Sequence, residues 1–214
     1  MNLVYGTKNQ GKLASMKNCL QTLTDTGDLQ IVGLNELNRT LPEAEEEGET
    51  PLENAGMKAL FYYRILNTPV FSGDSGLYFQ GLPEELQPGL QVRRVKGKRL
   101  DDREMIQYYA GLAKRNGGKL IGQYRNGISL VIDEEHRIDY DGDDIASKPF
   151  FLTDTPHEKC VAGLPLDSLS VDPDTGRYFY DQAEEKNRER LRQFQGGFLA
   201  FFRRAMPLLS SWSR

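Results

Sequence analysis

The feature that most constrains this chain is its opening, in which a short apolar run leads through a polar loop into a helical pattern. Asn2–Tyr5 is predicted to form a strand, and the loop that follows, residues 6–12, reads GTKNQGK. Beyond the loop, apolar side chains recur at helical spacing, at Leu13, Met16, Cys19, Leu20 and Leu23. A strand, a polar loop and a helix in this order are typical of α/β proteins, so we expect an α/β fold.

A second helix is predicted after an acidic loop, residues 41–48, which reads LPEAEEEG. Residues 50–53, TPLE, supply an N-cap threonine, a first-turn proline and the glutamate of a capping box. The apolar stripe of this helix consists of Leu52, Ala55, Ala59, Tyr62 and Leu66. Asn54 and Lys58, four residues apart, share a flank beside the stripe, and we expect that flank to face a cleft.

The remaining segments continue the alternation of strands and helices, and we expect a single domain over residues 1–214. The further elements predicted are a strand over residues 69–72 that ends at residues 73–76 (GDSG), a helix over 101–113, a hairpin over 119–140, and a helix over 182–206 broken or kinked at Gly196 and Gly197. Asp74 would then lie at the end of a strand, where the ligand sites of α/β proteins are found.

Composition and charge exclude several classes of protein. The net charge of −4 does not favour a surface for nucleic acid. Cys19 and Cys160 lie far apart and without ligand spacing, which is typical of a reduced protein with no zinc site. No apolar stretch is long enough to span a membrane, and the N-terminus lacks a leader pattern. We therefore expect a cytoplasmic protein without a nucleic-acid or membrane partner.

The loop over residues 6–12 formally satisfies the GxxxxGK pattern of a phosphate-binding loop. Leu13, however, stands where that motif requires a hydroxyl for Mg²⁺, and no second metal aspartate of the usual kind is evident. The helix N-terminus, with Thr7, Asn9 and Lys12, still forms a favourable position for an anion. An ordinary turn capped by Asn9 is the alternative.

Acidic residues supply a second group of candidates. Glu43, Glu45, Glu46 and Glu47 precede the Asn54 and Lys58 helix, and Asp74 follows the next strand. Mg²⁺ takes carboxylate oxygens, commonly one or two from the protein, so one glutamate with Asp74 would suffice. A solvated acidic loop is the alternative for the glutamate run.

Taken together, these motifs resemble those of the inosine-triphosphate pyrophosphatases, which act on non-standard purine nucleoside triphosphates. The matching stretches are Thr7-x-Asn9-x-x-Lys12, the run EEEGETPLENAGMKA over residues 45–59, residues 74–77, Pro88-Gly89 with Arg94, and residues 184–187. The resemblance implies an elongated, two-lobed α/β fold on a long mixed sheet, with the nucleotide in a cleft between the lobes, and a homodimer.

The resemblance also implies roles for the matching residues. Asp74, Lys12 and Lys58 would be the catalytic group, and Glu45 with Asp74 would bind Mg²⁺ as the cofactor. The substrate-binding residues would be Thr7, Asn9, Lys12, Asn54, Ser75, Arg94, Asp172, Lys186 and Arg192. Attack on the α-phosphorus requires charge to be neutralised on three phosphates, which lysines, a helix N-terminus and Mg²⁺ supply together.

The chain departs from the family pattern in two ways. Gly73 replaces one carboxylate of an acidic pair, so Asp74 would carry both of the acidic roles. Leu191 stands at a position of the base pocket where relatives have histidine, and it cannot provide the hydrogen bond. We therefore expect discrimination between inosine or xanthosine and adenine or guanine that is weaker than in typical members, or a preference shifted toward another base.

The predicted function is hydrolysis of a nucleoside or deoxynucleoside triphosphate, such as inosine or xanthosine triphosphate, to the monophosphate and pyrophosphate with Mg²⁺. Two alternatives remain: a catalytically weakened nucleotide-binding protein, which Gly73 favours, and a divergent phosphate-loop NTPase. The products distinguish all three.

Overall fold

The computed structural model describes residues 1–24 and 29–212, apart from the side chains of residues 22, 24 and 185–194. The chain divides into two compact units. The first unit contains Met1–Ser75, Asn126–Ile145 and Gln193–Arg214, and the second contains Gly76–Arg125 and Ala146–Arg192. This division does not test the expectation of one domain over residues 1–214, nor that of a cleft between lobes, and both stay predictions.

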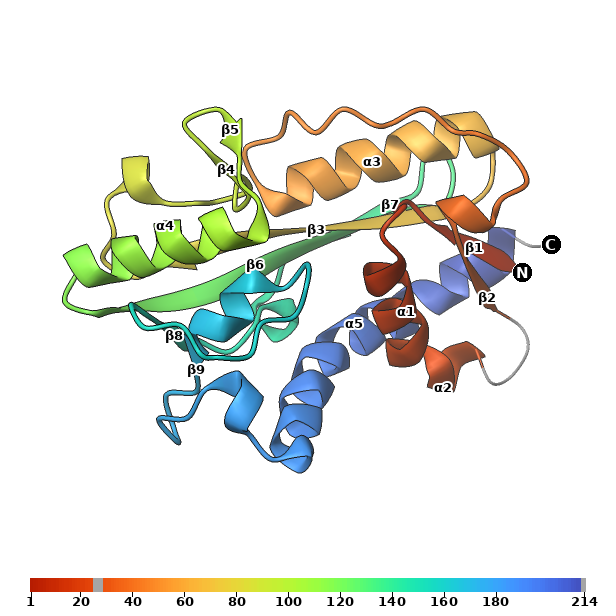
Figure 1. The fold of residues 1–214 in the computed structure, drawn as a ribbon. Coiled ribbons are helices and arrows are strands. Elements are labelled where there is room, and N and C mark those ends of the chain that lie inside the picture. Colours follow the sequence, from red (N-terminus) through yellow and green to blue (C-terminus); the bar gives the residue numbers. More distant parts are fainter. Residues whose placement is uncertain (25–28, 213–214) are drawn as a thin grey trace. The chain divides into compact units, whose positions relative to one another are not determined.

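The described strands form a mixed sheet in the order β2-β1-β3-β6-β8-β9, with β7 paired to β6. Strand β1 is parallel to β2 and β3, whereas β6 is antiparallel to β7 and β8. The strand bounds are β1 Asn2–Tyr5, β2 Gln30–Gly33, β3 Val70–Phe79, β6 Lys119–Val131, β7 Arg137–Tyr140, β8 Phe150–Thr153 and β9 Ser170–Val171. The α/β class with a long mixed sheet is thus confirmed (Figure 1).

In the first unit, helices cover both faces of the sheet (Figure 1). Successive residues of β1 point to opposite faces, so Leu3 and Tyr5 pack with α1 (Gln10–Cys19) and the C-terminal part of α5 (Glu184–Trp212). Val4 packs instead with α3 (Pro51–Leu66). A short helix α2 (Gln21–Thr24) follows α1.

In the second unit, helix α4 (Asp102–Arg115) packs on β8 and on the segment Pro165–Leu169. A separate hairpin is formed by β4 (Arg94–Val95) and β5 (Lys98–Arg99). The core here consists of Leu77, Phe79, Leu82, Met105, Tyr109, Leu112, Ala113, Leu120, Phe150, Leu152, Leu166 and Leu169.

Several predicted helix starts are confirmed. The side chain of Asn9 caps α1 by accepting from the N–H of Lys12. Thr50 and Glu53 form the predicted capping box of α3, and the structure also contains a capping box of Asp101 and Glu104 at the start of α4. The hairpin of β6 and β7 is also present, with Ile128 opposite Tyr140.

Two predicted terminations at glycine are wrong. Strand β3 continues through Gly73 to Phe79, so Asp74 lies within a strand rather than at its end. Helix α5 is unbroken at residues 196–197, so the predicted break is wrong, whereas the alternative of a kink stays a prediction. A Cβ at Gly197 would lie 2.3 Å from the carbonyl oxygen of Asp144, so this glycine permits a close contact instead of ending the helix.

Candidate functional site

The candidate site is built around Asp74, in the first unit. Pairing between β1 and β3 includes Tyr5 and Phe71, and β3 then continues three residues further to Asp74. Asp74 therefore lies just past the carboxyl end of β1, where the loop of residues 6–12 begins. Only 13% of its side chain is exposed, so its carboxylate depends on protein partners.

Two lysines converge on one oxygen of this carboxylate. The Nζ atom of Lys58 lies 3.4 Å from Oδ1 of Asp74, and that of Lys12 lies 3.8 Å from the same oxygen. Their side chains are 11% and 41% exposed, respectively. Desolvation and then the charge of Lys58 lower the pKa of Lys12 from its ordinary 10.5, against the opposing attraction of Asp74. The three residues assigned to the catalytic group, Lys12, Lys58 and Asp74, thus lie together, and their catalytic roles stay predictions.

Asn54 connects the acidic loop to Asp74. Its Oδ1 accepts from the N–H of Gly48 at 2.8 Å, and its Nδ2 donates to Oδ2 of Asp74 at 3.2 Å. Since a backbone N–H can only donate, the first bond fixes the orientation of the amide. Asn54 is 3% exposed, and a Cβ at Gly48 would lie 2.8 Å from its Oδ1. The glycine therefore permits the close approach that this connection needs.

Among the glutamates of the acidic loop, Glu46 reaches the cluster. Its Oε1 lies 3.2 Å from Nζ of Lys58. Glu43 instead pairs with Lys8 at 3.4 Å, at an exposed position. Glu45, which the family resemblance assigned to the metal, is exposed, and its assignment stays a prediction. The contacts of Lys58 place two acidic oxygens, from Glu46 and Asp74, around a single cationic atom.

The loop before α1 has the geometry of a capped helix start. Oγ1 of Thr7 accepts from the N–H of Asn9 at 3.1 Å, and Oδ1 of Asn9 accepts from the N–H of Lys12 at 3.0 Å. The predicted cap by Asn9 is thus confirmed. It leaves the hydroxyl proton of Thr7 and the amide group of Asn9 as donors for an anion at the helix N-terminus. Their predicted substrate contacts stay predictions.

Ser75 lies on the other face of β3 from Asp74, because adjacent strand residues point to opposite sides. Its Oγ donates to Oδ1 of Asn126 at 2.6 Å, and Nδ2 of Asn126 donates to the carbonyl oxygen of Ile145 at 2.6 Å. Sequence reasoning missed Asn126, which carries no motif and is 7% exposed. Ser75 thus contacts Asn126 rather than the Asp74 cluster. The predicted contact of Ser75 with the substrate stays a prediction.

Tyr5 was also missed by the sequence reasoning. A Cβ at Gly73 would lie 3.5 Å from its hydroxyl oxygen, so Tyr5 fills the space beside the position where the acidic pair is incomplete. Its ring stacks on Phe71 with centroids 4.4 Å apart. Burial, and then the charge of Asp74, raise the pKa of the Tyr5 hydroxyl, which therefore stays protonated.

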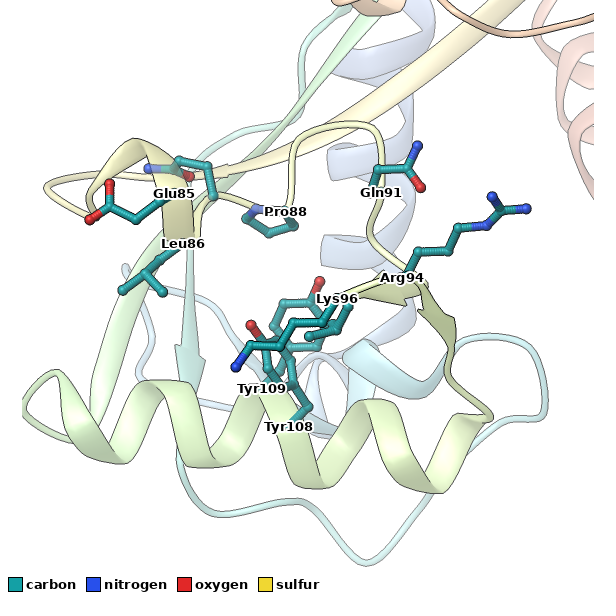
Figure 2. Close-up of a pocket in the computed structure, with 11 residues that line it drawn as sticks. Glu85, Leu86, Pro88, Gln91, Arg94, Lys96, Tyr108 and Tyr109 are labelled. Atoms are coloured by element: carbon teal, nitrogen blue, oxygen red, sulfur yellow. The ribbon is translucent and has the colours of Figure 1, made fainter.

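Arg94 belongs to the second unit, where it lines a cavity of about 470 Å³ beneath residues 85–97 (Figure 2). In Figure 2 its side chain is directed away from Tyr108 and Tyr109, which form the floor. Lys96 also lines the cavity, and it has a φ of 49° in the two-residue turn between β4 and β5. That backbone conformation favours glycine or asparagine over lysine.

The other predicted contacts of the second unit are less defined. Oδ1 of Asp172 accepts from the N–H groups of Asp174 and Thr175, at 2.8 Å and 3.0 Å, which caps a local turn. Lys186, Leu191 and Arg192 lie in α5, but their side chains lie outside the described part of the structure. The roles assigned to these residues stay predictions.

Comparison with known proteins identifies the family. The model of the Ham1 family matches residues 3–136, and this chain belongs to that family. The resemblance drawn from the motifs is thereby confirmed, and its three strongest signatures, between residues 7 and 77, all fall in the matched region.

Similar proteins carry a consistent name. The dITP/XTP pyrophosphatase of Oceanobacillus iheyensis is 32% identical over 105 residues, which are 49% of this chain and 50% of that protein. The protein of the same name from Thermus thermophilus is 27% identical over 189 residues, 88% of this chain and 84% of the relative. The chain thus spans about half the length of the first of these relatives.

A solved structure shares the fold. The HAM1 protein of Coxiella burnetii matches 96% of this chain and 100% of its own, with a TM-score of 0.74 and 23% identity. Within the described residues, no helix is both long and apolar enough to cross a membrane. The same residues contain no group of three or more histidine, cysteine or acidic side chains arranged to hold a metal.

Proposed function

We propose that this chain hydrolyses non-standard purine nucleoside triphosphates, such as inosine and xanthosine triphosphates and their deoxy forms, to the monophosphate and pyrophosphate. The observation that carries the proposal is the convergence of Lys12 and Lys58 on Asp74. The name of the similar proteins, dITP/XTP pyrophosphatase, agrees with it.

Two ammonium groups beside a helix N-terminus suit a triphosphate. Lys12 and Lys58 would neutralise phosphate oxygens, and Thr7 and Asn9 would donate to them at the start of α1. Such preorganised charge lowers the barrier because it is already in place when negative charge develops.

Asp74 has the position of the reacting carboxylate. In the proposed step, the oxygen of a water molecule bonds to the α-phosphorus while the bond from that phosphorus to the bridging oxygen breaks. Asp74 accepts the proton of the water, and pyrophosphate leaves with its charge neutralised by the lysines. Asn54 acts as a positioning residue, since its amide has a partner at each end.

The donor set of the cluster fits Mg²⁺. Lys58 already lies between carboxylate oxygens of Glu46 and Asp74, so these groups surround a position suited to a cation. Mg²⁺ prefers carboxylate oxygen and keeps several waters, so two protein ligands are sufficient. When bound, the metal would polarise the phosphates. Glu46 is therefore proposed as a Mg²⁺ ligand in addition to Glu45, which the family resemblance predicts.

The remaining parts of the proposal concern the substrate base and the assembly. Arg94, Asp172, Lys186 and Arg192 would contact the nucleotide, and Leu191 would limit discrimination between bases to the ~1–3 kcal/mol typical of apolar contacts. The protein would act as a homodimer in the cytoplasm, on free nucleotides. The net charge of −4 is in keeping with a partner other than nucleic acid.

Product analysis tests the proposal. The protein is incubated with Mg²⁺ and each of inosine, xanthosine, adenosine and guanosine triphosphates, and pyrophosphate and orthophosphate are measured separately. Pyrophosphate with the monophosphate is expected. Orthophosphate with the diphosphate would identify a phosphate-loop NTPase, and tight binding without products would identify a nucleotide-binding protein.

A further inference from the structure

Lys58 lies where a metal ion of the proposed function would be expected. Its Nζ atom is 3.2 Å from Oε1 of Glu46 and 3.4 Å from Oδ1 of Asp74. Lys12, by contrast, reaches Asp74 at 3.8 Å and has no ion pair with Glu46 within 4.0 Å among the described contacts. One ammonium group therefore contacts both of the acidic oxygens that suit a divalent cation.

We propose that Lys58 acts as a built-in counter-ion, which holds the position between Glu46 and Asp74 and weakens metal binding until a triphosphate arrives. This inference rests on the proposed function for the identity of the substrate, although its effect on metal affinity does not. It assigns Lys58 two successive partners, the carboxylates of the free protein and the phosphates of the substrate.

The burial of Lys58 explains why it would remain there. Only 11% of its side chain is exposed, and a buried ammonium group needs partners of opposite charge. Glu46 and Asp74 provide them in the free protein. A divalent cation at the same two oxygens would meet strong repulsion from Lys58 at close range, so metal binding requires the lysine to move.

A triphosphate removes this obstacle by offering other anions to Lys58. Its phosphate oxygens make charge-assisted hydrogen bonds with ammonium groups, and they also supply further ligands to the metal. The metal and the substrate are thus expected to enter together. The nucleotide-free protein would bind Mg²⁺ weakly. It would therefore not keep a metal ion in the site that could bind anions other than the substrate.

The chain offers two controls that remove the same charge. Lys12→Met takes one cation from Asp74 but leaves Lys58 between the two carboxylates. Lys17→Met acts on the same helix as Lys12, where the lysine pairs with Glu36 at 2.7 Å, away from the Asp74 cluster. If the metal affinity changes in Lys58→Met alone, the cause is the contact of Lys58 with both Glu46 and Asp74 rather than the loss of one positive charge.

The experiment measures Mg²⁺ binding to the full nucleotide-free chain by titration calorimetry, with Mn²⁺ and electron paramagnetic resonance as a second readout. Lys58→Met is expected to bind the metal at least about tenfold more tightly than the original protein. Lys12→Met should change the affinity less, Lys17→Met should leave it unchanged, and Lys58→Arg, which keeps the charge, should bind as weakly as the original.

Equal or weaker metal binding by Lys58→Met, or an equal gain in Lys12→Met, would overturn the inference. If Lys58→Met does not fold, Lys58→Gln, which keeps a hydrogen-bond donor, takes its place with the same expectation. Pyrophosphate release by the original protein is scored separately. A protein that releases pyrophosphate while Lys58→Met shows no gain contradicts this inference alone, and tighter binding without any cleavage contradicts the proposed function alone.

Discussion

The two units use charged side chains in different ways. The partners of Asp74 come from the first turn of α1 and from α3, Glu46 of the acidic loop pairs with Lys58, and the Asp74 side chain is 13% exposed. In the second unit, Lys98 pairs with Glu104, and Arg93 pairs with Asp102 at 2.7 Å. These partners lie six and nine residues apart in the chain, at more exposed positions.

The difference indicates which charges serve chemistry. Pairs formed between chain neighbours at the surface contribute little energy and support local structure, here the start of α4. Bringing charged groups from distant segments into a partly buried site costs desolvation energy. The fold alone gives no reason for that cost. Perturbed charges of this kind are concentrated at functional sites. Four predictions test the contrast, beginning with the largest expected effect.

Asp74→Asn should lower the turnover number at least about a hundredfold, because the amide cannot accept the proton of the attacking water. Circular dichroism should show the fold retained. Asp139→Asn is the matched control, since Asp139 pairs with Arg137 at 2.7 Å in the same unit but outside the cluster. Comparable turnover by the two variants would place the chemistry elsewhere.

Asn54→Leu should lower the free energy of unfolding by about 1–3 kcal/mol, because it leaves the N–H of Gly48 without its buried partner and removes the donor to Asp74. Asn116→Leu is the comparison in the second unit, where the exposed amide donates to the carbonyl of Leu112. Denaturant unfolding measures both. An equal or smaller loss in Asn54→Leu would contradict its role as a connection.

The pH dependence of stability should differ at Lys12. Because its pKa is lowered in the folded protein, the unfolded chain binds more protons between that lowered value and 10.5. The free energy of unfolding should therefore rise with pH across this window. Lys12→Met should remove that rise in denaturant unfolding measured from pH 7 upward. Parallel slopes in the two proteins would contradict a lowered pKa for Lys12 in the folded protein.

The smallest effect is expected at Glu104, at the other end of the pH scale. Lys98 and then the N–H of Asp101 lower the pKa of Glu104 from its ordinary 4.5. Its stabilising contribution is therefore present above 4.5 and is lost as pH falls through the lowered value. Glu104→Gln should shift the acid unfolding midpoint slightly, and Lys98→Met should reduce that shift. If Glu104→Gln lowered the free energy of unfolding more than Asn54→Leu does, the contrast between the two units would be contradicted.

Much of the fold could be predicted because local signals agreed with the final structure. Asn9, Thr50 and Asp101 are cap residues whose hydrogen bonds require only the next turn of helix. Gly73 and Gly197 misled because a glycine that permits close packing has the same sequence signature as one that ends an element. Only the tertiary contacts distinguish these cases.

Local sequence signals predicted only part of the candidate site. Asn54 and Lys58 share a helix flank, so their common direction follows from the helical period. Strand pairing and packing place Tyr5 beside Gly73 and Asn126 beside Ser75, and the sequence offers no spacing that predicts either contact. The choice among the glutamates of residues 43–47 depended on the path of a loop, which only the structure gives.

The most direct test of the central claim is the reaction in water enriched in oxygen-18, with inosine triphosphate and Mg²⁺ as the substrate. Attack on the α-phosphorus at the Asp74 cluster predicts that the heavy oxygen appears in the monophosphate and that the released pyrophosphate remains unlabelled. Mass spectrometry of both products measures this distribution. Labelled orthophosphate, or label in the pyrophosphate, would contradict the account, because water would then have attacked a different phosphorus.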